Sequence, residues 1–267
     1  MAERARENSI CLFAADFSET SQVVHFFTRD SGIVHLLAKG SKRAKSKTGG
    51  TLDLFSEGQL VFIPPRGEAM ATLVEFAEST NHSGLRRRLV TINAALYMVE
   101  ITSLLVAEVD PHPEAFDLMS AALRRMDQPD APAQAVLAFY QWRLLQHVGL
   151  LGEMSNCLAC GKLASGIGVH FSSHDGGLYC PDCHATALMD KRFVPPYAQA
   201  GLAVLRALDR GQKSTLTETQ ASAVNTLLAY HISYQLGRPL RMLPYIRRHQ
   251  AAGREIPAPA IREDGTT

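Results

Sequence analysis

Two Cys-x-x-Cys pairs constrain the fold of this chain more than any other feature. Cys157 pairs with Cys160 and Cys180 with Cys183, and nineteen residues separate the pairs. Two thiolates on one tight turn can approach the same ion, so two such turns supply the four soft ligands of a tetrahedral zinc site. We therefore predict one zinc ion bound by these four cysteines. Four thiolates leave no open coordination position, so the ion is expected to stabilise the fold and not to perform chemistry.

Other interpretations of the cysteines are two disulfides, a redox pair or four unrelated core residues. Nearby histidines could be substitute ligands, although four thiolates already satisfy zinc and surface positions are the simpler interpretation; these are His170, His174 and His184. The fifth cysteine, Cys11, lies in an apolar run and is predicted to be a small buried hydrophobe. An unpaired thiol together with a thiolate site indicates a reducing compartment, and we expect a cytoplasmic protein.

The first part of the chain has the pattern of a small β-barrel. A length of 267 residues suggests two or three domains. Short runs rich in Ile, Val, Leu and Phe predict strands at 9–14, 22–28, 33–38, 59–63 and 71–77. Five strands in so short a stretch favour a closed oligonucleotide-binding (OB) barrel within residues 1–80.

After residue 80 the pattern becomes helical. Apolar residues at three- and four-residue spacing predict helices at 85–108, 114–126, 132–148, 195–209 and 217–236. Thr217 and Gln220 have the pattern of a capping box, and Gly237 suits the end of the last helix. The predicted fold class is α+β: the barrel, then a helical domain at 81–250 with an inserted four-cysteine zinc finger at 156–184. Residues 251–267 are predicted to be a disordered tail.

Positive charge is concentrated although the net charge is only +1. No acidic residue occurs from 31 to 52, where the basic residues are Lys39, Lys42, Arg43, Lys45 and Lys47. Such a cluster predicts contact with phosphates, and the alternative is a solvated loop. Another acid-free stretch carries Arg238 and Arg241, which either extend a DNA path or only solubilise the end of a helical bundle.

Several segments resemble the RecO family of bacterial recombination mediators. The most specific is Leu-Leu-Ala-Lys-Gly-Ser-Lys-Arg-Ala-Lys-Ser-Lys at 36–47. Others are Phe-Tyr-Gln-Trp-Arg-Leu-Leu-Gln-His-Val-Gly at 139–149, both cysteine pairs with Gly176-Gly177, and Leu-Gly-Arg-Pro-Leu at 236–240. The chain departs from the family at Ala15 and Ser21, where relatives usually carry a basic residue and an acid. The resemblance covers nearly the whole chain.

The resemblance implies a DNA repair and recombination mediator. Members bind single- and double-stranded DNA, anneal complementary strands and bind the acidic C-terminal tail of single-stranded DNA-binding protein. With RecR, and in some lineages RecF, they help to load RecA. The DNA contacts would be made by the basic residues named above, from Lys39 to Lys47 together with Arg238 and Arg241. The acidic tail would need an apolar patch with an arginine, for which Arg143 is a candidate.

Catalysis and membrane insertion are not expected. The sequence has no His-Glu-x-x-His, no Gly-x-x-x-x-Gly-Lys loop and no clustered acids for two-metal chemistry. No signal peptide is recognisable, and the apolar stretch 89–109 is interrupted by Asn93, Glu100 and Glu108. A zinc-ribbon transcription or RNA-binding protein is the main alternative. Bases could stack on some phenylalanines of the barrel, although strand alternation turns about half of them inward.

Overall fold

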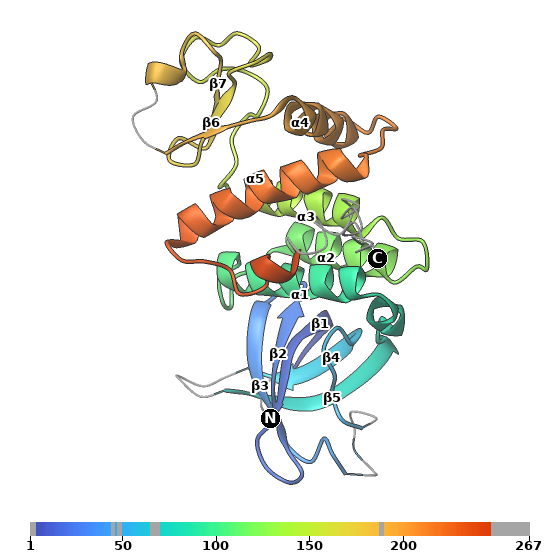
Figure 1. The fold of residues 1–267 in the computed structure, drawn as a ribbon. Coiled ribbons are helices and arrows are strands. Elements are labelled where there is room, and N and C mark those ends of the chain that lie inside the picture. Colours follow the sequence, from blue (N-terminus) through green and yellow to red (C-terminus); the bar gives the residue numbers. More distant parts are fainter. Residues whose placement is uncertain (1–3, 44–45, 47–49, 65–69, 187–189, 247–267) are drawn as a thin grey trace, which may run out of the picture.

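The N-terminal part of the molecule is a closed five-stranded barrel (Figure 1). The computed structural model describes residues 4–43, 46, 50–64, 70–186 and 190–246. The barrel strands are β1 (Ala5–Asp16), β2 (Gln22–Thr28), β3 (Gly32–Ala38), β4 (Glu57–Ile63) and β5 (Ala71–Thr80). They close in the order β1-β2-β3-β5-β4, with β3 and β5 parallel and the other pairs antiparallel. The predicted barrel is confirmed.

Strand alternation divides the side chains of the barrel into two sets. Val24 and Phe26 of β2 and Leu36 of β3 point inward and form a small core. Phe27 and Ile33, on the outer face, belong instead to the larger core shared with the helices. The helices cover only the upper part of the outer barrel surface (Figure 1), where Phe27 contacts Phe116 with ring centroids 5.7 Å apart.

The β2–β3 turn is shaped by its contact with the helical part of the chain. Gly32 has a φ of +70°, and a Cβ atom there would lie 2.3 Å from the carbonyl oxygen of Asp110. Only glycine combines this left-handed backbone with so close an approach. The turn therefore fixes where the segment after the first helix meets the barrel.

Five α-helices follow the barrel in the described part of the chain. They are α1 (Leu89–Leu105), α2 (Pro113–Met126), α3 (Ala133–His147), α4 (Pro196–Asp209) and α5 (Glu218–Leu236), and the short 3-10 helix η1 (Ser83–Arg87) precedes α1. The predicted helix 85–108 is thus divided, because Arg88 has extended backbone angles of −134° and 134°. The Thr217–Gln220 capping box is confirmed, as is Gly237 in the left-handed conformation after α5.

The cysteine segment, residues 156–184, lies at the end of the molecule opposite the barrel (Figure 1). Strands β6 (His170–Ser172) and β7 (Gly177–Tyr179) form a hairpin within it, and the 3-10 helix η2 (His184–Thr186) follows. Strand β8 (Lys191–Phe193) pairs with β6 and leads into α4. The sequence pattern does not reveal these strands, because three residues are too few to show alternation.

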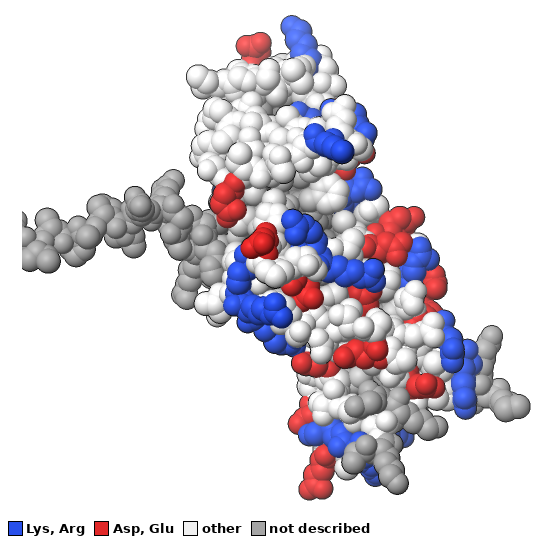
Figure 2. Space-filling view, turned by 90° about the vertical axis from the view of Figure 1, so that its right-hand side faces the viewer, with Lys and Arg blue, Asp and Glu red and all other residues white. Residues whose placement is uncertain are grey.

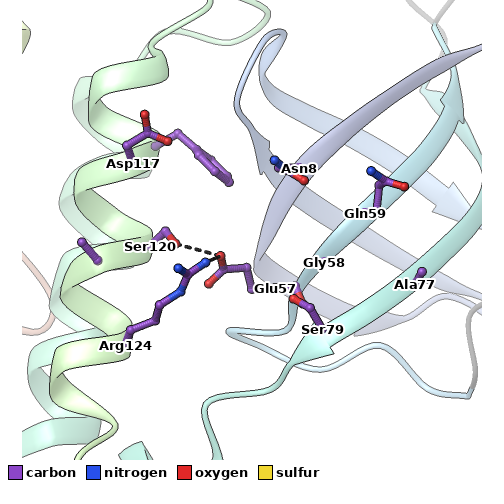
Figure 3. Close-up of a pocket in the computed structure, with 11 residues that line it drawn as sticks. Asn8, Glu57, Gly58, Gln59, Ala77, Ser79, Asp117, Ser120 and Arg124 are labelled. Atoms are coloured by element: carbon purple, nitrogen blue, oxygen red, sulfur yellow. Dashed lines mark hydrogen bonds and ion pairs between the residues drawn. The ribbon is translucent and has the colours of Figure 1, made fainter.

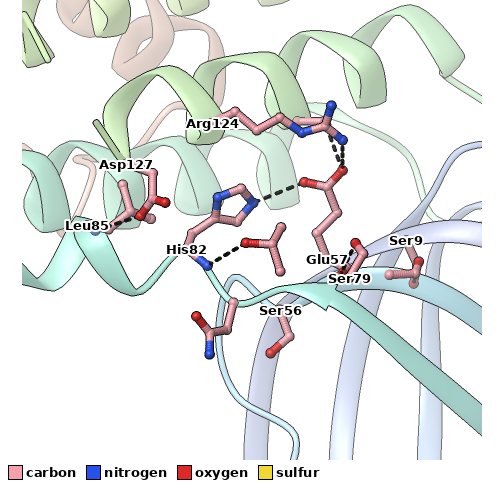
Figure 4. Close-up of polar contacts among 12 residues, drawn as sticks. Ser9, Ser56, Glu57, Ser79, His82, Leu85, Arg124 and Asp127 are labelled. Atoms are coloured by element: carbon pink, nitrogen blue, oxygen red, sulfur yellow. Dashed lines mark hydrogen bonds and ion pairs between the residues drawn. The ribbon is translucent and has the colours of Figure 1, made fainter. Parts of the chain in front are cut away.

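A buried polar network joins the barrel to α2 (Figure 4). The Glu57 side chain on β4 is only 7% exposed and accepts hydrogen bonds from Arg124 (2.5 Å), Ser120 (2.7 Å) and His82 (3.0 Å). Burial alone would raise the pKa of Glu57, but these hydrogen bonds outweigh it and lower the pKa to about 2. Glu57 is therefore charged and fully paired at the junction of the two parts.

No helix in the described part of the chain combines the length and the apolar character needed to cross a bilayer.

Candidate nucleic-acid interface and metal centre

The four paired cysteines converge on one point. Their Sγ atoms all lie within 4.8 Å of one another, and those of Cys160 and Cys180 are 3.8 Å apart. Backbone hydrogen bonds shape each turn: Gly161 donates to Cys157 O (2.9 Å) and Cys183 donates to Cys180 O (3.1 Å). The described residues thus bring together all four ligands predicted from the sequence.

This arrangement fits a tetrahedral metal ion. Thiolates about 2.3 Å from a central zinc lie about 3.8 Å from one another in a regular tetrahedron. Burial opposes ionisation of Cys157, yet hydrogen bonds with the backbone of Cys180 and Cys160 lower its pKa to about 6. The neighbouring thiols of Cys180 and Cys160 raise the pKa of Cys183 to about 12, because a further thiolate is disfavoured there without a cation. The cluster could hold one metal ion.

The histidines near the cysteines are not part of the cluster. Its described members are the four cysteines alone. His170 and His184 instead stack on each other with ring centroids 4.8 Å apart, and each ring is hydrogen-bonded to a backbone carbonyl oxygen. The fifth cysteine, Cys11, is fully buried in the barrel as predicted, and burial raises the pKa of its thiol to about 12.

The described part of the basic loop, residues 39–43, 46 and 50, lies at the lower end of the barrel, away from the helices (Figure 1). Lys39, Lys42 and Arg43 are exposed there. Lys42 Nζ lies 2.7 Å from Asp16 Oδ2 at the end of β1, a partner that the sequence pattern did not reveal. Lys45 and Lys47, also predicted to contact DNA, lie outside the described residues.

A hollow of about 330 Å³ opens between the basic loop and the β1–β2 loop. Lys39 and Arg43 line it on one side and Phe17 on the other, with Leu37 of β3 also contributing. Phe17 is 66% exposed, so a flat apolar ring and two cations border the same space. These are the two ingredients that binding of single-stranded nucleic acid requires.

Arg238 and Arg241 lie elsewhere. Both are exposed in the segment that follows α5. The Glu100 carboxylate of α1 accepts hydrogen bonds from the backbone N–H groups of Arg241 (2.6 Å) and Met242 (2.8 Å), which holds this segment against α1. The structure does not bring these arginines together with the basic loop, because α1 lies at the other end of the barrel (Figure 1).

The phenylalanines of the barrel separate into two groups. Phe26, Phe27, Phe55 and Phe62 are buried, whereas Phe13 and Phe17 are 44% and 66% exposed. Of these six, only the exposed pair could meet a base. The orientation of Phe13 depends on a β-bulge between Cys11 and Phe13 that the sequence pattern does not reveal.

Acidic and basic side chains alternate over the face of the molecule drawn in Figure 2. Blue and red groups lie side by side over the middle and lower parts of this face, whereas its upper end is mostly white. Attraction of phosphates to this face would therefore depend on local clusters of cations and not on one uniformly positive surface.

A polar groove of about 450 Å³ lies between the barrel and α2 (Figure 3). Asn8 and Gln59 line its barrel side and Asp117 its helical side, while Arg124 and Ser120 point across it to Glu57. The Arg124 guanidinium is already paired with Glu57. The groove is therefore a junction between the two parts of the molecule.

An apolar pocket of about 300 Å³ lies between the helices. Its residues come from α2, α3 with the residue before it, the end of α4 and the α4–α5 connection; they include Phe139, Val136 and Leu216, with Arg125 as the cation among them. Arg143, the arginine suggested by the sequence, instead donates to Asp209 (3.1 Å), and its neighbour Trp142 is buried. The sequence pattern does not reveal this pocket, because it is assembled from segments that are distant in the sequence.

Together these features define a class: a small barrel with a basic loop, joined to a helical domain with a cluster of four cysteines suited to a metal. Residues 1–81 match the family model described as "Recombination protein O N terminal", and residues 86–244 match "Recombination protein O C terminal".

Similar curated proteins carry the same family name. The DNA repair protein RecO of Salinibacter ruber is 31% identical over 88% of this chain and 90% of its own length. That of Myxococcus xanthus is 29% identical over 91% and 97%. The chain belongs to the RecO family of DNA repair proteins, which confirms the resemblance noted in the sequence.

Proposed function

We propose that this protein binds single- and double-stranded DNA and anneals complementary strands as a recombination mediator. The observation that carries the proposal is the hollow at the lower end of the barrel, where Phe17 faces Lys39 and Arg43 across the same space. A surface that screens phosphates without reading base edges allows two strands to approach and pair. Lys42, Lys45 and Lys47 would extend the positive rim of the hollow. Arg238 and Arg241 would contact DNA on a more distant path.

We propose that the cysteine cluster binds one structural zinc ion. The support is the convergence of four thiols without an open ligand position. Bound zinc would stabilise the segment between α3 and α4, because the unfolded chain has no preformed site. The protein would then act without bond-making catalysis, in the reducing cytoplasm near the nucleoid.

We propose that the apolar pocket at Arg125 receives the C-terminal tail of single-stranded DNA-binding protein. The acidic tail would need an apolar patch beside an arginine, and this pocket supplies both. RecR, and RecF where present, would join the protein in loading RecA.

Annealing of coated strands tests the proposal. Complementary oligonucleotides are first covered with single-stranded DNA-binding protein, and duplex formation is then followed with and without this protein. Acceleration is expected. An absence of acceleration, with RNA bound more tightly than DNA, would contradict the proposal and favour a zinc-ribbon RNA-binding protein.

A further inference from the structure

The apolar pocket between α2, α3 and the α4–α5 connection opens to solvent and has a positive edge. Its lining residues Ala121, Pro132 and Thr215 are exposed. None of the described residues that line it is acidic, and Arg125 is its cation. A second exposed cation, Lys213, directly precedes the lining residues of the α4–α5 connection. A ligand would therefore meet apolar surface inside the pocket and positive charge at its edge.

Half-buried apolar side chains form much of the pocket. They pack against the helical core on one side, and the described part of the chain leaves their other side uncovered; these residues are Leu118, Val136, Phe139, Leu208 and Leu216. Removal of apolar surface from water contributes about 25 cal/mol for each Å². An apolar segment that covered these side chains would therefore be stabilised by the contact.

The last described residue lies on the same helical domain. Ile246 is buried in the core that the helices share. The segment before it is held against α1, because the Glu100 carboxylate accepts hydrogen bonds from the backbone N–H groups of Arg241 and Met242. Residues 247–267 lie outside the described residues. They are covalently tethered to this point of the helical domain.

The sequence beyond Ile246 contains an apolar run followed by acids. Residues 256–261 are Ile-Pro-Ala-Pro-Ala-Ile, and Glu263 and Asp264 follow after Arg262. Proline-rich segments lose little conformational entropy when they bind in an extended form. The apolar run matches the interior of the pocket, and the two acids match the cations at its edge.

The tether is long enough to bring this run to the pocket. The helix α1 packs against both α2 and α3, which line the pocket, and packed helices lie about 8–10 Å apart. A helix of 17 residues such as α1 is about 25 Å long. The nine residues from 247 to 255 span up to about 30 Å when extended. Residues 256–264 therefore lie within reach of the pocket.

We propose that residues 256–264, hereafter the tail segment, occupy the apolar pocket and compete there with the acidic tail of single-stranded DNA-binding protein. The isoleucines and alanines would cover the half-buried side chains, while the two acids meet the cations at the edge. A tethered segment acts at an effective concentration on the order of 1 mM, so a contact that is weak between separate molecules fills the pocket. The inference rests on the proposed peptide site, to which it adds an internal competitor.

The competition would direct this protein to coated strands. A single copy of single-stranded DNA-binding protein in solution must displace a competitor that is always present. A strand covered with many copies offers many acidic tails close together, which raises their local concentration. The tail segment would therefore suppress binding to the free partner more than binding to the partner on DNA.

Photocross-linking locates the tail segment in the full chain. The photoreactive residue p-benzoylphenylalanine replaces Ala260, and mass spectrometry then identifies the residues to which it has become attached. Attachment within 118–140 or 208–216 is expected. The same group in place of Ala252, in the tether, is the control and should attach to these ranges less often.

Calorimetric titration with a synthetic peptide of the single-stranded DNA-binding protein tail measures the competition. Ile256→Asp with Ile261→Asp removes the large apolar side chains of the tail segment and should increase the affinity for the peptide about fivefold, because the tethered competitor is lost. Ala251→Asp with Ala252→Asp adds the same two charges to the tether and should leave the affinity unchanged. Thermal unfolding of each variant verifies the fold.

The outcomes distinguish the two proposals. If the peptide binds the wild type and the Ile256→Asp, Ile261→Asp variant equally and the cross-links lie elsewhere, the tail segment does not occupy the pocket, and the proposed peptide site stands. If the cross-links lie in the pocket but the peptide binds neither protein, the partner's tail has been assigned to the wrong site, and the competition is wrong with it. Cross-links in the pocket with equal peptide affinities would also exclude competition.

Discussion

The two ends of the molecule assemble their sites in different ways. In the cysteine segment, each turn presents two ligands that are three residues apart, so local spacing determines most of the geometry. On the barrel, the rings of Phe13, His25 and His35 come from three strands, and only strand register brings them together. A cluster built from local turns is visible in a sequence, whereas a cluster built from register requires the fold.

Removal of one cysteine ligand is expected to have the largest effect on the molecule. Cys157→Ser or Cys180→Ser is expected to abolish metal binding and to lower the unfolding temperature together, because structural zinc binding contributes about 10 kcal/mol or more in small zinc-dependent folds. Metal analysis and calorimetry measure the two effects.

The fifth cysteine provides the matched control for metal content. Cys11→Ala removes a thiol that lies in the barrel core and should leave the bound metal unchanged. A metal-free Cys157→Ser protein with wild-type stability would show that the cluster has no structural role.

The junction between the two ends can be weakened at Glu57. Glu57→Ala leaves His82 buried without its partner and should lower the free energy of unfolding by about 3 kcal/mol, measured by urea titration. Glu75→Ala, on the exposed face of β5, is the control and should change it by less than about 0.5 kcal/mol.

The same carboxylate predicts a pH dependence. Its pKa falls from 4.5 to about 2 on folding, so its stabilising contribution is present above pH 4.5 and is lost as the pH falls toward 2. In the Glu57→Gln variant, the loss of stability that protonation of Glu57 causes below pH 4.5 should be absent. An identical acid titration of both proteins would contradict the assigned role of the network.

Charge reversal in the basic loop tests whether the lower end of the barrel contacts phosphates. Lys42→Glu with Arg43→Glu should weaken binding of single-stranded DNA about tenfold and reduce the magnitude of the salt slope by about 1.4, which corresponds to two phosphates. Arg238→Glu with Arg241→Glu is the comparison, and a smaller effect is expected because these residues lie against α1. An unchanged slope in the loop variant would exclude phosphate contact there.

The smallest expected effect concerns the pocket between the helices. Arg125→Ala should weaken binding of an acidic C-terminal peptide about fivefold, because one exposed charge–charge contact contributes about 1 kcal/mol. Arg143→Ala, whose guanidinium is paired with Asp209, should leave the affinity unchanged. Calorimetric titration measures both, and the reverse order of effects would assign the peptide to Arg143.

Much of the fold was predictable, because short runs rich in Ile, Val, Leu and Phe mark the barrel strands. The predicted strand 22–28 coincides with β2, and the capping box at Thr217 formed as expected. The helix expected at 85–108 was wrong in one respect, since periodicity alone could not show that the chain is extended at Arg88.

The sites were less predictable where distant segments meet. The Lys42–Asp16 pair and the pocket at Arg125 depend on how segments far apart in the sequence pack against one another. Nothing in the local pattern of Phe13 distinguished it from the core phenylalanines, because the bulge that exposes it is a property of strand pairing.

The extra residue at Leu12 makes β1 unequally tolerant of changes in its length. If Leu12 were deleted, Cys11 and Phe13 would become consecutive, and regular alternation would still turn Phe13 outward and Ala14 inward. If one residue were inserted there instead, regular alternation would again turn Phe13 outward, but the rest of β1 would shift by two residues against β2 and Phe13 would lie opposite Val23 instead of His25. Among related sequences, a gap at this point of the strand should therefore be less disruptive than an insertion.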